Sequence, residues 1–549
     1  MLKLTAGDTL GSIISGVAAT YPKREAIVAG QQRINYDVLM DRVDSLANAL
    51  LKLGVKKGEK VAIWMGNKPE WVYANYACSK IGAPVVPLNT RYKAYELEHI
   101  LGQSDSTTLF MMDRFINIDY VPIIDEVCPE LKNSKPGQLE CESFPFLKRI
   151  IMFGKSHYPG MFDYYTVLNS GKDYAKSDGF EKAQEAVKQE DVYIIPFTSG
   201  TTGFPKGVVT THYQYLRVVE GVSARLNMSD QDRILVVSPF SHNMGNMTGM
   251  LLGACNGACI IPMESFDPGE ALRLIHEEKV SKFAGSPTMY IMMLDHPDFP
   301  KRDTTSIRSS MIGAADVSPD LVRTIMDRMG IKDLISAYGL TENTGVSTMS
   351  QPGDPPEVVA HTAGKLIFPD CELKVLNPDT GEEVPRGTQG EICSRGFYVL
   401  TEYYKMPEET AVAIDSKGWF HTGDLGIMDE KDYIKITGRL KDMFITGGVN
   451  VYPAEIENYL LTHSKISIAS VVGVPDRRMG EVGMAFIKLK PGATATQDEI
   501  IKFARERMAN YKAPKYVRFV EDYPMTATGK IQKFVLRKSA VKELGLDKE

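Results

Sequence analysis

The sequence has no excess of either charge and no long apolar run. Lys and Arg number 63 against 69 Asp and Glu, and no basic block stands out, so nucleic acid is not expected as the main partner. The longest apolar stretch after the N-terminus, GMLLGACNGACIIPM (249–263), is short and interrupted by glycine and asparagine. It predicts a buried core segment and no integral membrane segment. The N-terminal LGSIISGVAAT lacks a basic region before it, which predicts a packed helix and not a signal peptide.

Cysteines are few and have no framework spacing. Seven are scattered over 549 residues, an odd number that predicts buried, reduced thiols in a reducing compartment. Cys255 and Cys259 lie four apart, but no second pair of ligands accompanies them, which argues against a zinc site. The cytoplasm is the expected location.

The length requires two or more domains, and the pattern changes twice along the chain. In the first half, helices such as YDVLMDRVDSLANALLKLG alternate with short apolar strands such as EKVAIWMG and APVVPLN, which predicts an α/β fold with parallel, doubly wound sheets. Residues 112–146 interrupt this rhythm and suggest a surface insertion. After about residue 365, short strands with Gly, Pro and Asp turns predict a β-rich subdomain. Beyond GRLKD (438–442), helices and strands alternate in a second, smaller α+β domain.

A glycine-rich stretch, TSGTTGFPKG (198–207), follows an apolar run and suggests phosphate binding. Glycines let backbone amides approach an anion, and a lysine adds positive charge. The spacing excludes a P-loop, because Pro205 stands five residues after Gly200 and Lys206 is followed by Gly207 instead of Ser or Thr. No kinase-type glycine loop precedes a V-A-I-K-like strand either. Taken alone, the stretch could also be a plain surface turn.

A second motif, ISAYGLTENTG (335–345), places an aromatic ring, a hydroxyl and a carboxylate within one turn. Tyr338 could stack on a purine, Thr341 could bond phosphate and Glu342 could hold a magnesium ion. A buried tyrosine beside a turn is the alternative for this motif alone.

Three further residues stand in glycine-containing segments of the second half. Asp424, in GWFHTGDLG (418–426), could accept two ribose hydroxyls, and Arg439 could reach ribose or phosphate. Lys530 follows a glycine in PMTATGKIQK (524–533), where a solvated surface lysine is the alternative.

In this order and at these distances, the motifs resemble those of the adenylate-forming superfamily of acyl-CoA synthetases, luciferases and peptide-synthetase adenylation domains. The resemblance covers nearly the whole chain and is closest to AMP-forming acyl-CoA synthetases. It implies a large N-terminal nucleotide- and acyl-binding domain (1–438), a hinge (439–443) and a small mobile C-terminal domain (444–549), with the active site between the domains.

The resemblance assigns a role to each matching residue. The residues that it implies at the β- and γ-phosphates of ATP are Thr198, Ser199, Gly200, Thr201, Thr202 and Lys206. Those lining the adenine and acyl pockets are Gly313, Ala314 and Ala315 in GAAD, with Tyr338 and Gly339 at the adenine. Asp424 and Arg439 are implied at the ribose, and Glu342 at Mg²⁺. The implied catalytic residues are Lys530, Thr341, Glu342 and His242.

Two half-reactions follow from the resemblance. A carboxylate first attacks the α-phosphorus of MgATP, giving an acyl-adenylate and pyrophosphate, and coenzyme A then takes the acyl group as AMP leaves. Lys530 stabilises the charge that grows in the first step. Rotation about Lys441 then removes Lys530 and brings Gly447 and Gly448 to the pantetheine. A plain turn before the helix that Pro453 begins is the alternative for this glycine pair.

The sequence indicates less clearly which carboxylic acid is used. In the family the acyl pocket is built from segments 238–249, 285–290, 312–316 and 338–345. His242 either gates the acyl or ATP channel or is a satisfied loop histidine. Met244, Met247 and Met289 predict an apolar, adaptable pocket. FSHNMGN offers no carboxylate, which disfavours an α-amino acid, whereas medium-chain, branched, alicyclic and aryl acids stay open.

The leading hypothesis is an AMP-forming carboxylate–CoA ligase that uses a small-molecule acid, ATP, Mg²⁺ and coenzyme A. The first alternative is an enzyme that stops at the adenylate or passes the acyl group to a carrier protein. No carrier domain follows the second domain, which favours free coenzyme A. A nucleotide-binding regulator without turnover is a further alternative, disfavoured because every motif position is filled. A homodimer is left open.

Overall fold

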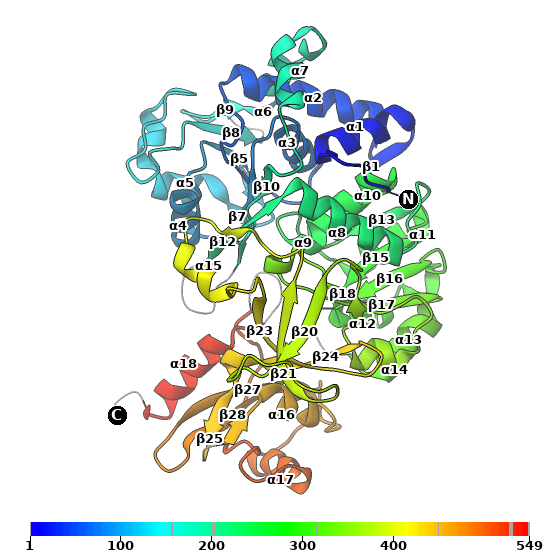
Figure 1. The fold of residues 1–549 in the computed structure, drawn as a ribbon, viewed down its shortest axis with the longest axis vertical. Coiled ribbons are helices and arrows are strands. Elements are labelled where there is room, and N and C mark those ends of the chain that lie inside the picture. Colours follow the sequence, from blue (N-terminus) through cyan, green and yellow to red (C-terminus); the bar gives the residue numbers. More distant parts are fainter. Residues whose placement is uncertain are drawn as a thin grey trace. The chain divides into compact units, whose positions relative to one another are not determined.

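The computed structural model describes residues 2–154, 157–198, 205–313, 317–447, 449–525 and 531–546. Its contacts divide the chain into two compact units, drawn in Figure 1. Unit 1 comprises Met1–Glu372 and Arg395–Gly418, and unit 2 comprises Leu373–Ser394 and Trp419–Glu549. The β-rich segment after residue 365 is therefore shared, and most of it belongs to the same unit as the C-terminal residues. The hinge at 439–443 stays a prediction.

Unit 1 contains two large sheets, as the alternating pattern predicts. The first has the strand order β19-β18-β17-β16-β15-β13-β14-β1-β2. Its central strands are parallel: β17 (Asp333–Tyr338), β16 (Ser309–Ile312), β15 (Lys282–Gly285), β13 (Arg233–Val236), β14 (Cys259–Pro262) and β1 (Glu25–Ala29). The antiparallel edge strands are β18 (Thr348–Met349), β19 (Lys365–Leu366) and β2 (Gln32–Asn35). Helices α11 (Pro268–Glu278), α12 (Pro287–Leu294) and α13 (Pro319–Met329) connect successive parallel strands.

The second sheet has the order β11-β12-β10-β4-β3-β5-β8-β9. Its strands are β11 (Phe197–Thr198), β12 (Lys206–Thr211), β10 (Val192–Ile194), β4 (Val85–Pro87), β3 (Val61–Trp64), β5 (Thr108–Met112), β8 (Arg149–Phe153) and β9 (Phe162–Asp163). A short strand from far along the chain, β22 (Glu402–Tyr403), pairs with β12.

The helices of unit 1 bury the faces that their sequences predict. In α2 (Tyr36–Lys52), Leu39, Val43, Leu46 and Leu50 are all buried. Every residue of α3 (Pro69–Lys80) is buried, as expected of a helix surrounded by core. LGSIISGVAAT forms the packed helix α1 (Leu10–Thr20).

Residues 112–146 differ from the predicted surface insertion. They include helix α5 (Tyr120–Val127), and Cys128, Leu131, Cys141 and Phe144 are buried. The polar composition of this segment concealed apolar side chains that join the core of unit 1.

Unit 2 contains two sheets. The first has the order β20-β21-β23-β24 and consists of β20 (Glu372–Leu376), β21 (Gln389–Arg395), β23 (Phe420–Met428) and β24 (Ile434–Arg439), apart from the end residues Glu372 and Arg395, which belong to unit 1. Strand β23 pairs antiparallel with both β21 and β24. The second consists of β25 (Phe444–Thr446), β26 (Val449–Val451), β27 (Ile466–Asp476), β28 (Gly480–Leu489) and β29 (Tyr516–Phe519). Its helices are α16 (Pro453–Leu460), α17 (Gln497–Arg507) and α18 (Lys533–Glu543). This mixture confirms the α+β class of the C-terminal part.

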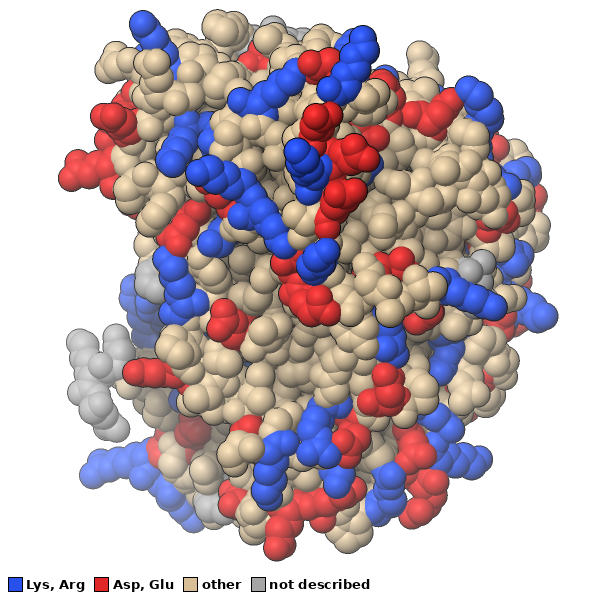
Figure 2. Space-filling view, turned by 45° about the horizontal axis from the view of Figure 1, so that its top comes forward, with Lys and Arg blue, Asp and Glu red and all other residues tan. Residues whose placement is uncertain are grey.

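One prediction from what the sequence lacks is confirmed in the part of the chain that the structure describes. All seven cysteines are free, and six of them are buried. No described helix is both long and apolar enough to cross a bilayer. Figure 2 shows basic and acidic side chains interspersed over the visible face, as the balanced charge predicts.

Candidate functional site

The carboxyl ends of four parallel strands in unit 1 lie next to several of the predicted site residues. The register aligns Phe283 of β15 with Leu235 of β13, Gly285 with Ile312 of β16, and Ile312 with Ser336 of β17. In open parallel sheets, ligands bind outside these strand ends. His242 and Gly313 lie in segments that follow these strands and Tyr338 is the last residue of β17, so the topology brings all three to one edge of the sheet.

The turn after β17 is closed so tightly that it requires glycine at one position. A Cβ on Gly339 would lie 2.4 Å from the carbonyl oxygen of Gly345 and 2.7 Å from Cα of Val346. The amide of Gly345 donates to the carbonyl of Leu340 at 2.8 Å, which closes the turn around residues Thr341–Asn343. Thr341 and Glu342 are half-buried there, with their hydroxyl and carboxylate beside Tyr338 in the chain.

The Glu342 carboxylate has a partner that the sequence motifs do not include. The Tyr403 hydroxyl donates to Oε1 of Glu342 at 3.0 Å. Burial and the charge of Glu342 raise the pKa of Tyr403 far above its usual value, so the hydroxyl stays a donor at neutral pH. The backbone supports the same arrangement, because the amide of Leu400 donates to the carbonyl of Glu342 at 2.7 Å.

Tyr403 also reaches the base of the glycine-rich stretch. Strand β22 pairs with β12, with Val208 opposite Tyr403, and the Lys206 ammonium lies 5.0 Å from the centre of the Tyr403 ring. This distance is typical of a cation–π contact. Thr198 stands opposite Lys206 in the hairpin, with its hydroxyl 3.5 Å from the Lys206 carbonyl oxygen. Tyr403 therefore contacts both motif residues: its ring contacts Lys206 and its hydroxyl contacts Glu342.

Several predicted site residues lie outside the described residues. They are Ser199, Gly200, Thr201, Thr202, Ala314, Ala315, Gly448 and Lys530. Their roles stay predictions.

His242 acts as a helix cap. Its Nδ1 accepts a hydrogen bond from the amide of Met244 at 3.3 Å, at the start of α9 (Asn243–Gly245). The neutral ring therefore carries its proton on Nε2. This contact supports the satisfied-loop alternative for one ring nitrogen, and gating of the acyl channel stays a prediction.

In unit 2, Asp424 and Arg439 form an ion pair. They stand opposite each other in β23 and β24, and Nε of Arg439 lies 2.6 Å from Oδ1 of Asp424. The Asp424 side chain is only 4% exposed and that of Arg439 is 37% exposed, so the guanidinium lies at the surface of the pair. The structure brings these two predicted ribose ligands together.

Glu391 positions the loop that carries Asp424, and no sequence motif includes it. Its Oε1 accepts from the amide of Gly423 at 3.0 Å, and its Oε2 lies 2.8 Å from Nδ1 of His421. Gly423 has a left-handed backbone, with φ of +68°, so the turn favours glycine. The Thr422 hydroxyl accepts from the amide of Asp424 at 3.0 Å, which completes the anchorage.

Two predicted residues lie further along unit 2. Lys441 is exposed in the short helix Leu440–Asp442, at the predicted hinge. Gly447 has φ of +59°, and its amide donates to the Met479 carbonyl at 2.7 Å. A Cβ on Gly447 would lie 2.8 Å from Cε of Met479, so a larger residue would displace that side chain.

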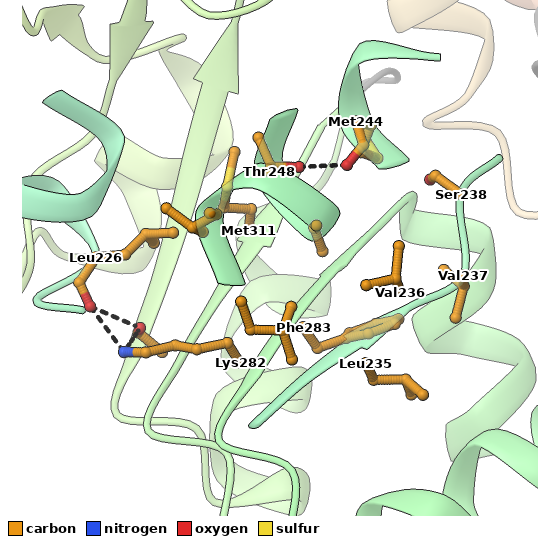
Figure 3. A pocket seen from close by; sticks show the side chains of 15 residues that line it. Leu226, Leu235, Val236, Val237, Ser238, Met244, Thr248, Lys282, Phe283 and Met311 are labelled. Carbon is orange, nitrogen blue, oxygen red and sulfur yellow. Dashed lines mark hydrogen bonds between the residues drawn. The ribbon is translucent and has the colours of Figure 1, made fainter. Parts of the chain in front are cut away.

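A narrow cavity lies against the first sheet of unit 1 and is mostly apolar (Figure 3). Its volume of ≈ 10 Å³ accommodates about one water molecule. Its wall is formed by strands β13, β15 and β16 together with the segment 244–252. Met244 is one of the predicted pocket methionines and lines it, whereas Met247 and Met289 do not.

Comparison with known sequences agrees with these motifs over almost the whole chain. The pattern described as "AMP-binding enzyme" matches residues 15–404, and that of the "AMP-binding enzyme C-terminal domain" matches residues 455–530. The mitochondrial medium-chain acyl-CoA ligase ACSF2 of Mus musculus is 36% identical over 545 residues, 98% of this chain and 88% of that protein. The (7a-methyl-1,5-dioxo-octahydro-1H-inden-4-yl)propanoyl:CoA ligase of Rhodococcus jostii (strain RHA1) is 38% identical over 531 residues, 96% of this chain and 98% of that protein.

Solved structures agree as well. The crystal structure of the anthranilate CoA ligase AuaEII in complex with anthranoyl-AMP superposes with a TM-score of 0.85 and 25% identity, covering 99% of each chain.

Proposed function

The chain belongs to the family of AMP-binding enzymes and is an AMP-forming acid–CoA ligase, and from this premise we propose that it joins a medium-chain, alicyclic or aryl carboxylic acid to free coenzyme A. The observation that carries the proposal is the contact chain Lys206–Tyr403–Glu342, which links the glycine-rich stretch to the predicted magnesium carboxylate.

The residues of this chain suit the triphosphate of ATP. The Lys206 ammonium supplies positive charge at the base of the phosphate stretch, and its stacking on Tyr403 limits its movement. Glu342 and Thr341 offer oxygen atoms, which are the ligands that Mg²⁺ prefers, and Mg²⁺ characteristically takes one or two carboxylates together with substrate phosphates. Bound Mg²⁺ would neutralise phosphate charge there. Glu342 is held by Tyr403 in position for this role.

Adenylation needs positioning and fixed positive charge more than covalent chemistry. We assign to Lys530 the positive charge that balances the negative charge at the pentacoordinate α-phosphorus as the acid's carboxylate attacks and pyrophosphate leaves. Asp424 accepts the ribose hydroxyls, and Arg439 orients its carboxylate through the 2.6 Å contact.

The apolar wall of the cavity supports an acid with a hydrocarbon body. No carboxylate lines the cavity among the described residues, so an α-amino group would lack a counter-ion there. The relatives named above act on medium-chain and alicyclic acyl groups, which fall in the same class. The substrate range is therefore proposed as medium-chain, alicyclic or aryl acids.

Thioester formation is assigned to the turn at Gly447, whose left-handed backbone favours glycine. Free coenzyme A is preferred over a carrier-protein thiol, which is the second candidate. The free, mostly buried thiols support a reducing compartment such as the cytoplasm.

The test is a panel of carboxylic acids with ATP, Mg²⁺ and either coenzyme A or a phosphopantetheinylated carrier protein. The expected products are AMP and pyrophosphate, with turnover that depends on coenzyme A for at least one acid of the proposed class. Release of ADP, or turnover that requires the carrier protein, would contradict the proposal.

A further inference from the structure

The residues that line the small cavity described above are spread along the parallel strands. Ser238 and Met244 line it beyond the carboxyl end of β13, whereas Lys282 and Ser309 line it at the amino ends of β15 and β16. Strand β15 begins at Lys282 and ends at Gly285, so the lining residues extend over roughly 10 Å along this strand. An acyl group that enters from the carboxyl edge of the sheet would therefore point its far end toward Lys282.

Lys282 is buried, with 3% of its surface exposed. Its ammonium donates to the Leu226 carbonyl oxygen and to the Ser309 hydroxyl, both at 2.7 Å (Figure 3). An ammonium group has three donors. Among the described residues, the structure gives it two acceptors, both uncharged, so one donor is available at this end of the cavity.

The nearby charged residues do not explain why a lysine is buried at position 282. Asp232 attracts it electrostatically, but its Oδ1 is bonded to the Arg308 guanidinium and to the Ser281 hydroxyl, each at 2.5 Å. Burial lowers the pKa of Lys282 to about 8, so the group is still mostly protonated at neutral pH. A buried ammonium without a contacting carboxylate is costly, and an apolar residue would avoid that cost.

A purely structural role explains part of the arrangement. Leu226 is the C-cap of helix α8 (His212–Arg225), and a lysine that bonds its carbonyl suits the negative end of the helix dipole. This role uses one donor. It does not explain why a buried ammonium helps to line a mostly apolar cavity whose other lining residues, such as Ser238 and Met244, reach the predicted active-site edge.

We propose that Lys282 donates a hydrogen bond to an oxygen atom at the distal end of the acyl group, so that the enzyme selects acids with a far-end keto or carboxylate oxygen over plain alkanoates. This inference rests on the proposed ligase function. Met244 and Met311 line the cavity, and their flexible side chains can move to admit the chain.

The experiment compares three acids of equal length: octanoate, 7-oxooctanoate and suberate, with decanoate, 9-oxodecanoate and sebacate as the longer set. The measured quantity is kcat/KM for CoA-dependent AMP formation by the full-length enzyme. We expect the best oxygen-ended acid to exceed the alkanoate of the same length by about tenfold or more, the usual effect of a buried hydrogen bond to a charged group. The oxo and dicarboxylate arms distinguish a neutral acceptor from a charged one.

Two variants separate recognition from packing. Lys282→Met keeps a similar length without a donor, and the ratio of oxygen-ended to plain acid is expected to fall about tenfold. Lys332→Met, at an exposed lysine, serves as the matched control and should keep the wild-type ratio. A purely structural Lys282 would lower both rates by one factor and leave the ratio unchanged, which would overturn the inference.

If Lys282→Met does not fold, the kcat/KM values of the wild-type enzyme for plain and oxygen-ended acids still test the inference. Equal kcat/KM for plain and oxygen-ended acids would overturn the inference while leaving the ligase function standing. Absence of CoA-dependent AMP with every acid would overturn both, so the two failures are distinguishable.

Discussion

The Tyr403 hydroxyl donates to the Glu342 carboxylate at 3.0 Å, although the two residues lie 61 positions apart. The same ring lies 5.0 Å from the Lys206 ammonium. A residue outside every recognised motif therefore holds two motif residues at a fixed separation. Its effect should appear in the binding of magnesium and triphosphate more than in folding.

Replacing Tyr403 with phenylalanine removes this hydroxyl and keeps the ring. Without the donor, Glu342 is less well oriented, so we expect the Mg²⁺ concentration for half-maximal adenylation to rise roughly threefold to tenfold. ATP–pyrophosphate exchange measured over a magnesium titration reports this shift.

Tyr404→Phe is the matched control, because its hydroxyl bonds Asp105 at 3.2 Å and not Glu342. It should leave the magnesium dependence as in the wild type. An equal shift in both variants, or a lower maximal rate at unchanged magnesium dependence, would assign Tyr403 a structural role only.

Gly339→Ala should damage the turn between Tyr338 and Glu342. The added Cβ would meet backbone atoms of Gly345 and Val346 at 2.4–2.7 Å, and backbone cannot move as cheaply as a side-chain tip. We expect the KM for ATP to rise about tenfold or more, measured by pyrophosphate exchange. Gly102→Ala, where nothing lies within 4 Å of the added Cβ, is the control and should behave as the wild type.

Asp424→Asn tests the ribose assignment. An amide presents one oxygen where the carboxylate presents two, so the KM for ATP should rise about tenfold. The rise should be smaller with 2′-deoxy-ATP, which lacks one of the hydroxyls that Asp424 is assigned to accept. The same factor for both nucleotides would mean that Asp424 serves only its ion pair with Arg439.

The sequence predicted proximity only for those candidate residues that are local in the chain. Tyr338, Thr341 and Glu342 fall in one turn, and Asp424 stands directly opposite Arg439 across two adjacent strands. Periodicity also identified the buried face of α2. These features depend on residues within one turn, one helix or two successive strands, where spacing carries the information.

The contacts that the sequence did not reveal are those between distant segments. Tyr403 is placed by the pairing of β22 with β12, and Glu391 reaches Gly423 from another strand. The assignment of residues 373–394 to unit 2 depends on strand pairing in the same way, because β21 pairs with β23. Neither composition nor spacing encodes such pairings.

His212 predicts an acid-sensitive stability. The ring is buried, its Nδ1 accepts from the amide of Leu10 at 3.4 Å, and burial lowers its pKa from 6.5 to about 4. Between these two values the unfolded chain binds a proton that the folded chain does not, so stability falls as the pH falls from about 6.5 to about 4. The total loss amounts to roughly 3 kcal/mol.

His212→Asn keeps an acceptor but does not titrate, so its Tm should fall less steeply with acid than that of the wild type. Differential scanning calorimetry between about pH 7 and about pH 5 measures both slopes. The exposed His157 provides the control, and His157→Asn should keep the wild-type slope. Parallel slopes for all three proteins would show that other groups govern acid unfolding.

The two half-reactions should respond oppositely to changes at Lys530 and Gly447. Lys530→Ala removes the charge assigned to adenylation, so pyrophosphate exchange should fall by roughly a hundredfold or more, while thioester formation from a supplied acyl-adenylate continues. Gly447→Leu places a side chain at φ of +59° and against Met479, so it should slow thioester formation and spare adenylation. Met479→Ala in the Gly447→Leu background relieves the clash but leaves the side chain in the pantetheine path. It should therefore fail to restore thioester formation. Recovery would mean that the clash with Met479, and not access of coenzyme A, caused the loss. Equal damage to both steps by Lys530→Ala or by Gly447→Leu would contradict the assignment of the two residues to different half-reactions.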